Sequence, residues 1–130
     1  MDRLFLDANV VFSAAYRTDA RLLALWKLKN VSLCSSRYAL EEATINLEDE
    51  GQRQRLQVLS AKIHLFEAAD RELPREISLP EKDIPILLAA IASKADYLLT
   101  GDYRHFGPYF GKKIAGVTIL PPGQYLKKRI

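Results

Sequence analysis

Short apolar segments alternate with segments of helical spacing along the chain, and this alternation constrains the fold more than any other feature. Strands are predicted at 3–7, 31–34, 96–100 and 116–120. Strands that alternate with helices form right-handed crossovers, which build a parallel sheet covered by helices on both faces. In such sheets ligands bind at the carboxyl ends of the strands, where the strand order reverses. We therefore expect the chemistry of this chain at that edge of the sheet.

Apolar residues at helical spacing predict helices at 9–16, 19–29, 36–49 and from 83 onward. Asp19 and Ser36 belong to the residue types that cap helix N-termini. Gly51 is expected to break the chain after the helix at 36–49. The segment 56–66 also has helical spacing, although its end reads equally as a short strand. The prolines at 121 and 122 are expected to end the last strand before a basic tail.

Composition excludes several classes of protein. The 130 residues suit one domain, and 48% hydrophobic with 27% charged residues is typical of a soluble globular chain. The longest apolar run, 86–92, is much shorter than the roughly twenty residues that span a membrane. The N-terminal sequence lacks the apolar stretch of a signal peptide. Cys34 is the single cysteine, which excludes internal disulfides and a cysteine-rich zinc site. We therefore expect a cytoplasmic protein without a membrane partner.

Four acidic residues stand out as candidate catalytic groups. Asp7 and Asp102 each follow a predicted strand, so both belong to the same edge of the sheet. Asp83 begins a helix that is apolar nearly all round. Glu42 lies on the shoulder of the apolar stripe of its helix, whereas Glu41 has polar neighbours on a solvated face. A cleft at this edge is therefore expected to contain Glu42 rather than Glu41.

Each of these residues also has a purely structural explanation. Asp7 and Asp83 are suited to cap the helices that they precede, and Asp102 follows Gly101 in a common kind of turn. Glu42 taken alone reads as a surface residue. Capping and metal binding are compatible, because a capping carboxylate has a second oxygen to offer.

Carboxylates gathered at one cleft repel one another and raise one another's pKa values. A divalent cation removes this repulsion, and sites built from oxygen ligands suit Mg²⁺ or Mn²⁺. Such a cluster is a common device for the metal-assisted attack of water on a phosphodiester, since the metal lowers the pKa of the water and a carboxylate accepts its proton.

Four short motifs contain the acids, in the order Leu6–Val10, Ser36–Glu42, Lys82–Leu87 and Leu98–Phe106. Their order and spacing resemble those of the PIN-domain nucleases, which include the toxins of VapBC-type toxin–antitoxin pairs. The resemblance extends from residue 4 to about residue 126. Each motif is weak by itself, and the four together are specific.

The resemblance implies an α/β fold in a single domain over residues 1–130, namely a three-layer α/β/α sandwich around a central, mainly parallel five-stranded sheet. It also implies a Mg²⁺- or Mn²⁺-dependent endoribonuclease whose partners are RNA, a cognate antitoxin protein and a second copy of the chain. The catalytic residues and metal ligands that it implies are Asp7, Glu42, Asp83 and Asp102, with Asn9, Ser13 and Thr100 as the polar residues around them.

The segment 103–106 departs from the family pattern. Some members carry a further acid just after the fourth motif, and this chain has none there, which leaves the occupancy of a second metal site open. His105 reads either as a phosphate contact or as a residue that packs its turn. Arg104 and His105 are candidate RNA contacts, and the mildly basic net charge of +3 is compatible with a polyanionic partner.

Two alternatives belong to other functional classes. The first is a catalytically inactive PIN scaffold that binds RNA or a protein partner. The second is a phosphoacceptor receiver domain, which has a similar length and clustered aspartates. A receiver needs a lysine at the end of its last strand and adjacent acids after its first. Residues 117–122 contain no lysine, and Ala8 follows Asp7.

Overall fold

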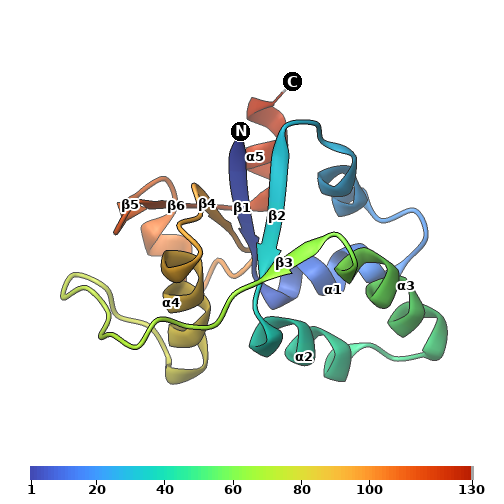
Figure 1. Cartoon of the computed structure of the whole chain (residues 1–130), viewed down its shortest axis with the longest axis horizontal. Helices are drawn as coiled ribbons and strands as arrows, with labels where there is room; N and C mark the ends of the chain where they lie inside the picture. The colour runs from blue at the N-terminus through green and yellow to red at the C-terminus, as the bar shows by residue number, and fades with distance from the viewer. Residues whose placement is uncertain (130) are drawn as a thin grey trace.

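A sheet in the strand order β3-β2-β1-β4-β6-β5 organises the chain in the computed structural model, which describes residues 1–129 (Figure 1). Its strands are β1 (Asp2–Leu6), β2 (Val31–Ser35), β3 (Ile63–Leu65), β4 (Tyr97–Leu99), β5 (Lys113–Ile114) and β6 (Val117–Leu120). The strands β1, β2, β3, β4 and β6 are parallel, and β5 runs antiparallel to β6. The expected α/β fold with a mainly parallel sheet is confirmed.

The sheet has six strands rather than the expected five, because a tight hairpin adds β5. Ala115 and Gly116 connect β5 to β6 and have positive φ angles of 48° and 90°. Two successive positive φ angles are typical of the turn that suits the twist of a two-residue hairpin. The second position is a glycine, as this conformation favours.

The helices are α1 (Ala8–Tyr16), α2 (Arg37–Asn46), α3 (Glu50–Ser60), α4 (Ile84–Ala92) and α5 (Pro122–Lys128), with 3-10 helices η1 (Arg21–Lys27), η2 (Glu81–Asp83) and η3 (Gly107–Tyr109). Helix α1 packs against α2, α3 and η1. The 3-10 helix η1 also contacts α5, and α4 packs against β4. In Figure 1, α4 lies on one side of strands β1 and β2, while α1, α2 and α3 lie on the other. The helices therefore form the two outer layers around the sheet.

Several expected helix boundaries are wrong. Asp19 forms an ion pair with Arg17 (3.6 Å) instead of capping a long helix, and the segment after it is the 3-10 helix η1. Gly51 lies inside α3, because Asp49 starts this helix with a capping box in which Asp49 and Gln52 bond each other's backbone N–H groups. Helix α2 ends before the expected residue 49, and the expected basic tail is helix α5. Ser36 does cap α2, since its hydroxyl accepts from Ala39 N at 3.1 Å.

The sheet order fixes where a site can lie. Strand β1 has β2 on one side and β4 on the other, so the strand order reverses at β1 and β4. Leu6 is paired with Leu99, which brings the residues that follow β1 next to those that follow β4. The order also differs from the 2-1-3-4-5 order of receiver domains, so the receiver alternative is wrong. No helix among residues 1–129 has the length and apolarity that a membrane crossing requires.

Candidate active site

Asp7 lies at the carboxyl end of β1 and is buried, with 4% of its surface exposed. Its Oδ1 accepts a hydrogen bond from Ala8 N at 2.7 Å, which caps helix α1. Its Oδ2 accepts from the Thr100 hydroxyl at 2.8 Å and from Asn9 Nδ2 at 3.2 Å. The capping role and the site position expected for Asp7 therefore coexist, and each uses a different oxygen.

Burial raises the pKa of Asp7 from 3.8 to about 6. The hydrogen bonds from Thr100 and Ala8 favour the ionised form and limit this rise, whereas the negative charges of Asp83 and Glu42 add to it. A carboxylate in such surroundings changes its protonation state close to neutral pH.

Thr100, at the end of β4, connects Asp7 to the turn that carries Asp102. Its hydroxyl donates to Asp7 and accepts from Asp102 N at 3.1 Å. Asn9 closes the network, since its Nδ2 lies 3.3 Å from the Thr100 hydroxyl and its Oδ1 accepts from Gly101 N at 2.8 Å. The carboxyl ends of β1 and β4 are therefore joined by side chains that hold the Asp7 carboxylate in one orientation.

Asp83, Asp102 and His105 form the tightest group of metal-binding side chains among the described residues, with one ligand atom from each within 4.8 Å of the others. His105 Nδ1 lies 2.9 Å from Asp102 Oδ2 and 3.2 Å from Asp83 Oδ2. The backbone N–H of His105 donates to Asp102 Oδ1 at 3.0 Å. Asp83 does not cap helix α4 through its side chain, so the structural explanation for this residue fails.

The two aspartates of this group have pKa values shifted in opposite directions. Burial raises the pKa of Asp83, the nearby charge of Asp102 adds to the rise, and the charges of Lys82 and His105 oppose it. Burial also acts to raise the pKa of Asp102, but hydrogen bonds from the backbone and ring of His105, with its charge, lower that pKa overall. Asp102 is therefore the more readily ionised of the pair.

Glu42 is exposed on α2 and reaches the site through its charge rather than through a hydrogen bond. Its neighbour Tyr38 donates a hydrogen bond to the carbonyl oxygen of Lys82 at 2.7 Å, which ties α2 to the turn before Asp83. Glu42 does not belong to the group of ligand atoms around His105. Arg104 is exposed in the turn after β4.

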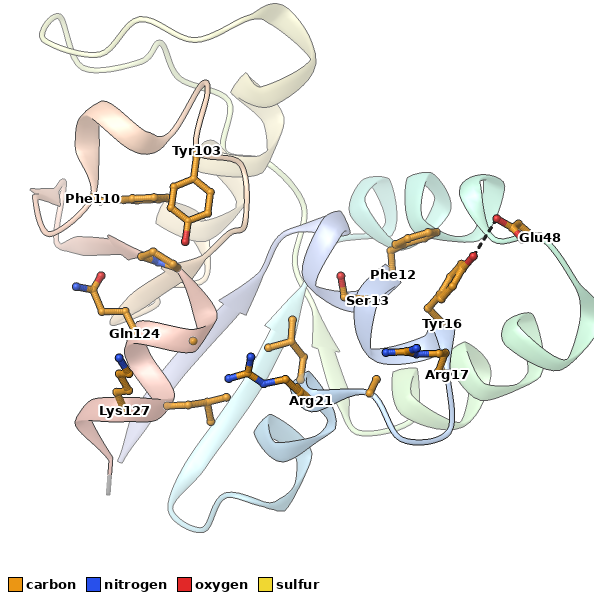
Figure 2. A pocket seen from close by; sticks show the side chains of 15 residues that line it. Phe12, Ser13, Tyr16, Arg17, Arg21, Glu48, Tyr103, Phe110, Gln124 and Lys127 are labelled. Atoms are coloured by element: carbon orange, nitrogen blue, oxygen red, sulfur yellow. Dashed lines mark hydrogen bonds between the residues drawn. The ribbon is translucent and has the colours of Figure 1, made fainter.

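An open groove of about 1310 Å³ is the feature that the sequence did not reveal. Figure 2 shows Phe12 and Tyr16 of α1 on one wall, and Tyr103 and Phe110 on the opposite wall. The rings of each pair are in contact, with centroids 5.4 Å and 5.2 Å apart. Ser13, one of the expected polar residues, is exposed and lines this groove instead of bonding Asp7. Three cationic side chains also line the groove, namely Arg17, Arg21 and Lys127.

The groove lies beside the acidic site. Tyr103 directly follows Asp102, and Ser13 lies one helical turn after Asn9 on α1. The spacing of Phe12 and Tyr16, four residues apart on one helix, was the available signal for an aromatic wall. The opposite wall comes from the chain after β4, whose path depends on tertiary structure.

Comparisons with known proteins identify similar chains. A family model described as a PIN domain matches residues 3–104. The crystal structure of VapBC2 from Rickettsia felis, bound to a DNA fragment from its promoter, contains a chain with 18% identity and a TM-score of 0.68, and the match covers 92% of this chain and 98% of that one. The structure of FitAB bound to an IR36 DNA fragment contains another, with 18% identity, a TM-score of 0.55 and coverage of 92% and 94%. No curated protein matches the sequence.

Proposed function

The chain belongs to the PIN domain family, and from this premise we propose that it is a metal-dependent endoribonuclease, the toxin of a toxin–antitoxin pair. PIN domains are generally nucleases. The observation that carries the proposal is that Thr100 joins the buried Asp7, after β1, to Asp102, after β4, and that Asp102 groups with the buried Asp83 of η2; Asp7 and Asp83 are 4% and 7% exposed. Buried acids that raise one another's pKa values need a compensating positive charge.

The donor set fits a divalent cation. Asp83 Oδ2 is buried and has no hydrogen-bond partner, so it has an unused lone pair at the site. We propose that Asp7, Glu42, Asp83 and Asp102 hold the ion, and that it is Mg²⁺ or Mn²⁺, because carboxylates are the ligands these ions prefer. A divalent ion bound there supplies a water of lowered pKa and a positive charge for the phosphodiester oxygens.

The chain's own residues supply orientation and a proton acceptor. Thr100 and Asn9 fix the Asp7 carboxylate by hydrogen bonds of 2.8 and 3.2 Å. A carboxylate with a pKa near the working pH is suited to accept the proton that an attacking water loses. The pKa of Asp7 is about 6 in the metal-free protein, and a bound cation would lower it, so we assign Asp7 to holding the ion and leave the proton acceptor among the four acids.

The groove supports single-stranded RNA as the substrate. Nucleic-acid bases stack on aromatic side chains, and Arg and Lys neutralise phosphates. Tyr103 is 68% exposed beside Asp102, so a base can stack on its ring while the adjoining phosphate faces the acids. Arg104, Arg21 and Lys127 are then the candidate phosphate contacts at the site and along the groove.

Cleavage of a mixed RNA pool tests the activity. We expect cleavage with Mg²⁺ or Mn²⁺ and none in EDTA, and we expect Asp102→Asn to abolish it while RNA binding persists. RNA binding without cleavage under either metal would favour the inactive scaffold. Cleavage that continues in EDTA would contradict a metal-dependent mechanism.

Two protein partners complete the proposal. The structurally similar VapBC2 and FitAB are two-component assemblies, and by analogy we propose a cognate antitoxin for this chain and a second copy of the chain as its homodimer partner, in the cytoplasm. A small neighbouring reading frame whose product copurifies with the chain and stops RNA cleavage would support the antitoxin. Sedimentation that gives a monomer at micromolar concentration would exclude the homodimer.

A further inference from the structure

His105 is held in place by more than its own turn. Its backbone N–H donates to Asp102 Oδ1 at 3.0 Å, and Phe106 N donates to the carbonyl oxygen of Asp102 at 3.1 Å. Phe106 itself is fully buried, which anchors the segment. These bonds are sufficient to stabilise the turn. They leave unexplained why the ring also lies 3.2 Å from Asp83, which comes from a different element, η2.

The second observation is the state of the Asp83 carboxylate. Asp83 is 7% exposed, and its Oδ2 makes no hydrogen bond although His105 Nδ1 is within reach. Nδ1 carries at most one proton, so it can donate to only one of the two carboxylates, and its shorter contact is with Asp102 Oδ2 at 2.9 Å. A buried carboxylate oxygen without a donor is costly. A cation held between Asp83, Asp102 and His105 would give this oxygen the partner that it lacks.

We infer that His105 Nδ1 is a metal ligand together with Asp83 and Asp102, in a mixed nitrogen and oxygen site that selects first-row transition ions over Mg²⁺. This inference rests on the proposed metal-dependent function and specifies its ion. The three ligand atoms already lie within 4.8 Å of one another. Ligation requires a neutral imidazole with its proton on Nε2, so Nδ1 cannot donate a hydrogen bond to Asp102 while it holds the ion.

The imidazole nitrogen of His105 determines which metal ion the site prefers. Mg²⁺ is a hard ion that keeps oxygen ligands and gives up its waters reluctantly. Imidazole suits later transition ions best, and Mn²⁺, at the weak end of that series, accepts it more readily than Mg²⁺ does. Among the two ions compatible with the acidic residues, Mn²⁺ therefore gains from His105 and Mg²⁺ does not. His105→Asp would give the site oxygen ligands alone, which removes the reason for this preference.

Spectroscopy of bound Mn²⁺ tests the inference without measuring activity. The chain has two histidines, His105 and His64, and His64 is exposed on β3. Pulsed electron paramagnetic resonance detects the nitrogen of a coordinated imidazole. We expect nitrogen coupling in the wild type and in the control His64→Ala, and its loss in His105→Ala. In His105→Asp, we expect the ratio of the Mg²⁺ to the Mn²⁺ dissociation constant to fall about tenfold.

Circular dichroism establishes that each variant is folded before its metal binding is compared, and His105→Asp serves if His105→Ala does not fold. Bound Mn²⁺ without nitrogen coupling in the wild type would overturn the inference, even if RNA is cleaved. Absence of Mn²⁺ binding would overturn it as well. Nitrogen coupling that depends on His105 in a protein that cleaves no RNA would support the ligand and contradict the proposed nuclease.

Discussion

Asp7 combines a structural and an electrostatic role in one side chain. One oxygen caps α1, and the other is held by Thr100 and Asn9 against the end of β4. Asparagine caps helices nearly as well as aspartate, so a change of Asp7 to Asn separates the cap from the charge. The negative charge of Asp7 is destabilising in the metal-free protein, since burial raises the pKa of this group to about 6.

We predict that Asp7→Asn changes the pH dependence of stability in EDTA. The pKa of Asp7 in the folded state, about 6, exceeds its ordinary value of 3.8. The folded wild type therefore keeps a proton that the unfolded chain loses, so its free energy of unfolding falls between pH 4 and pH 6. The size of this fall is about 3 kcal/mol, and the variant lacks it.

Denaturant titrations at several pH values measure this effect. The variant and the wild type are expected to diverge from pH 4 upward, with the variant becoming relatively more stable. Parallel profiles would mean that Asp7 ionises as freely in the folded state as in the unfolded chain.

The strand-end rule placed Asp7 and Asp102 at one edge of the sheet, and the family resemblance implied Asn9 and Thr100 as the polar residues around them. In the structure, Asp7, Asn9 and Thr100 contact one another. Ser13 depended on the direction of a helical side chain and lies in the groove instead. The contact of His105 with Asp83 joins a turn to a 3-10 helix that are distant in the chain, and no periodicity in the sequence reports it.

At the scale of the element, α2 presents its two adjacent glutamates differently. Glu42 is among the charges that raise the pKa values of Asp7 and Tyr38. The helical wheel had distinguished the two by their neighbours, with Glu42 beside the apolar stripe of the helix and Glu41 on its polar face. Both side chains are exposed, which makes the pair a matched test.

We predict that Glu42→Gln reduces RNA cleavage at least tenfold and that Glu41→Gln leaves it within about twofold of the wild type. Each change removes one negative charge from an exposed position of α2, so changes of this kind typically alter stability by less than about 0.5 kcal/mol. Initial cleavage rates at saturating Mn²⁺ provide the comparison. The opposite pattern would show that the face of α2 carrying Glu41 serves the site.

Helix α3 shows why glycine misleads sequence reading. Gly51 was expected to end a segment, yet it is the second residue of α3. The decisive signal is the capping box of Asp49 and Gln52, which is a pair of side chains and not a property of the glycine. A hydrogen-bonded N-terminus stabilises the helix enough to include a residue of poor helix propensity.

We therefore predict that Gly51→Ala stabilises the protein by about 0.5–1 kcal/mol, because alanine is preferred inside a helix. The nearest contact of the added Cβ is Asp49 Oδ1 at 3.4 Å, which is an ordinary distance. The midpoint of urea unfolding measures the change, and RNA cleavage should be unaffected. A loss of stability would indicate that residue 51 adopts a non-helical conformation.

At the scale of the whole molecule, the acids come from segments distributed over most of the sequence. Asp7 follows β1 and Asp102 follows β4, whereas Glu42 lies on α2 and Asp83 on η2. The mutual repulsion of these four negative charges opposes the compact state. An ion bound to the folded protein alone stabilises it by about 2.7 kcal/mol at one hundred times its dissociation constant.

We predict that saturating Mn²⁺ raises the melting temperature of the wild type by at least several degrees, and that Asp7→Asn shows a much smaller rise. Differential scanning calorimetry in EDTA and in Mn²⁺ gives both values. A full shift in the variant would mean that Asp7 neither binds the ion nor senses its charge.

The central position of β1 also determines when the site can exist. Leu4 of β1 is paired with Tyr97 of β4, and such distant pairings form slowly because a long loop must close first. During synthesis from the N-terminus, Asp7 is made early, whereas Thr100, which bonds it, and Asp102, which bonds Thr100, are made about ninety residues later. A nascent chain shorter than about residue 100 therefore contains most of the acids but no assembled site. Any hydrolysis of RNA by this protein begins only after translation has delivered β4 and the turn that follows it.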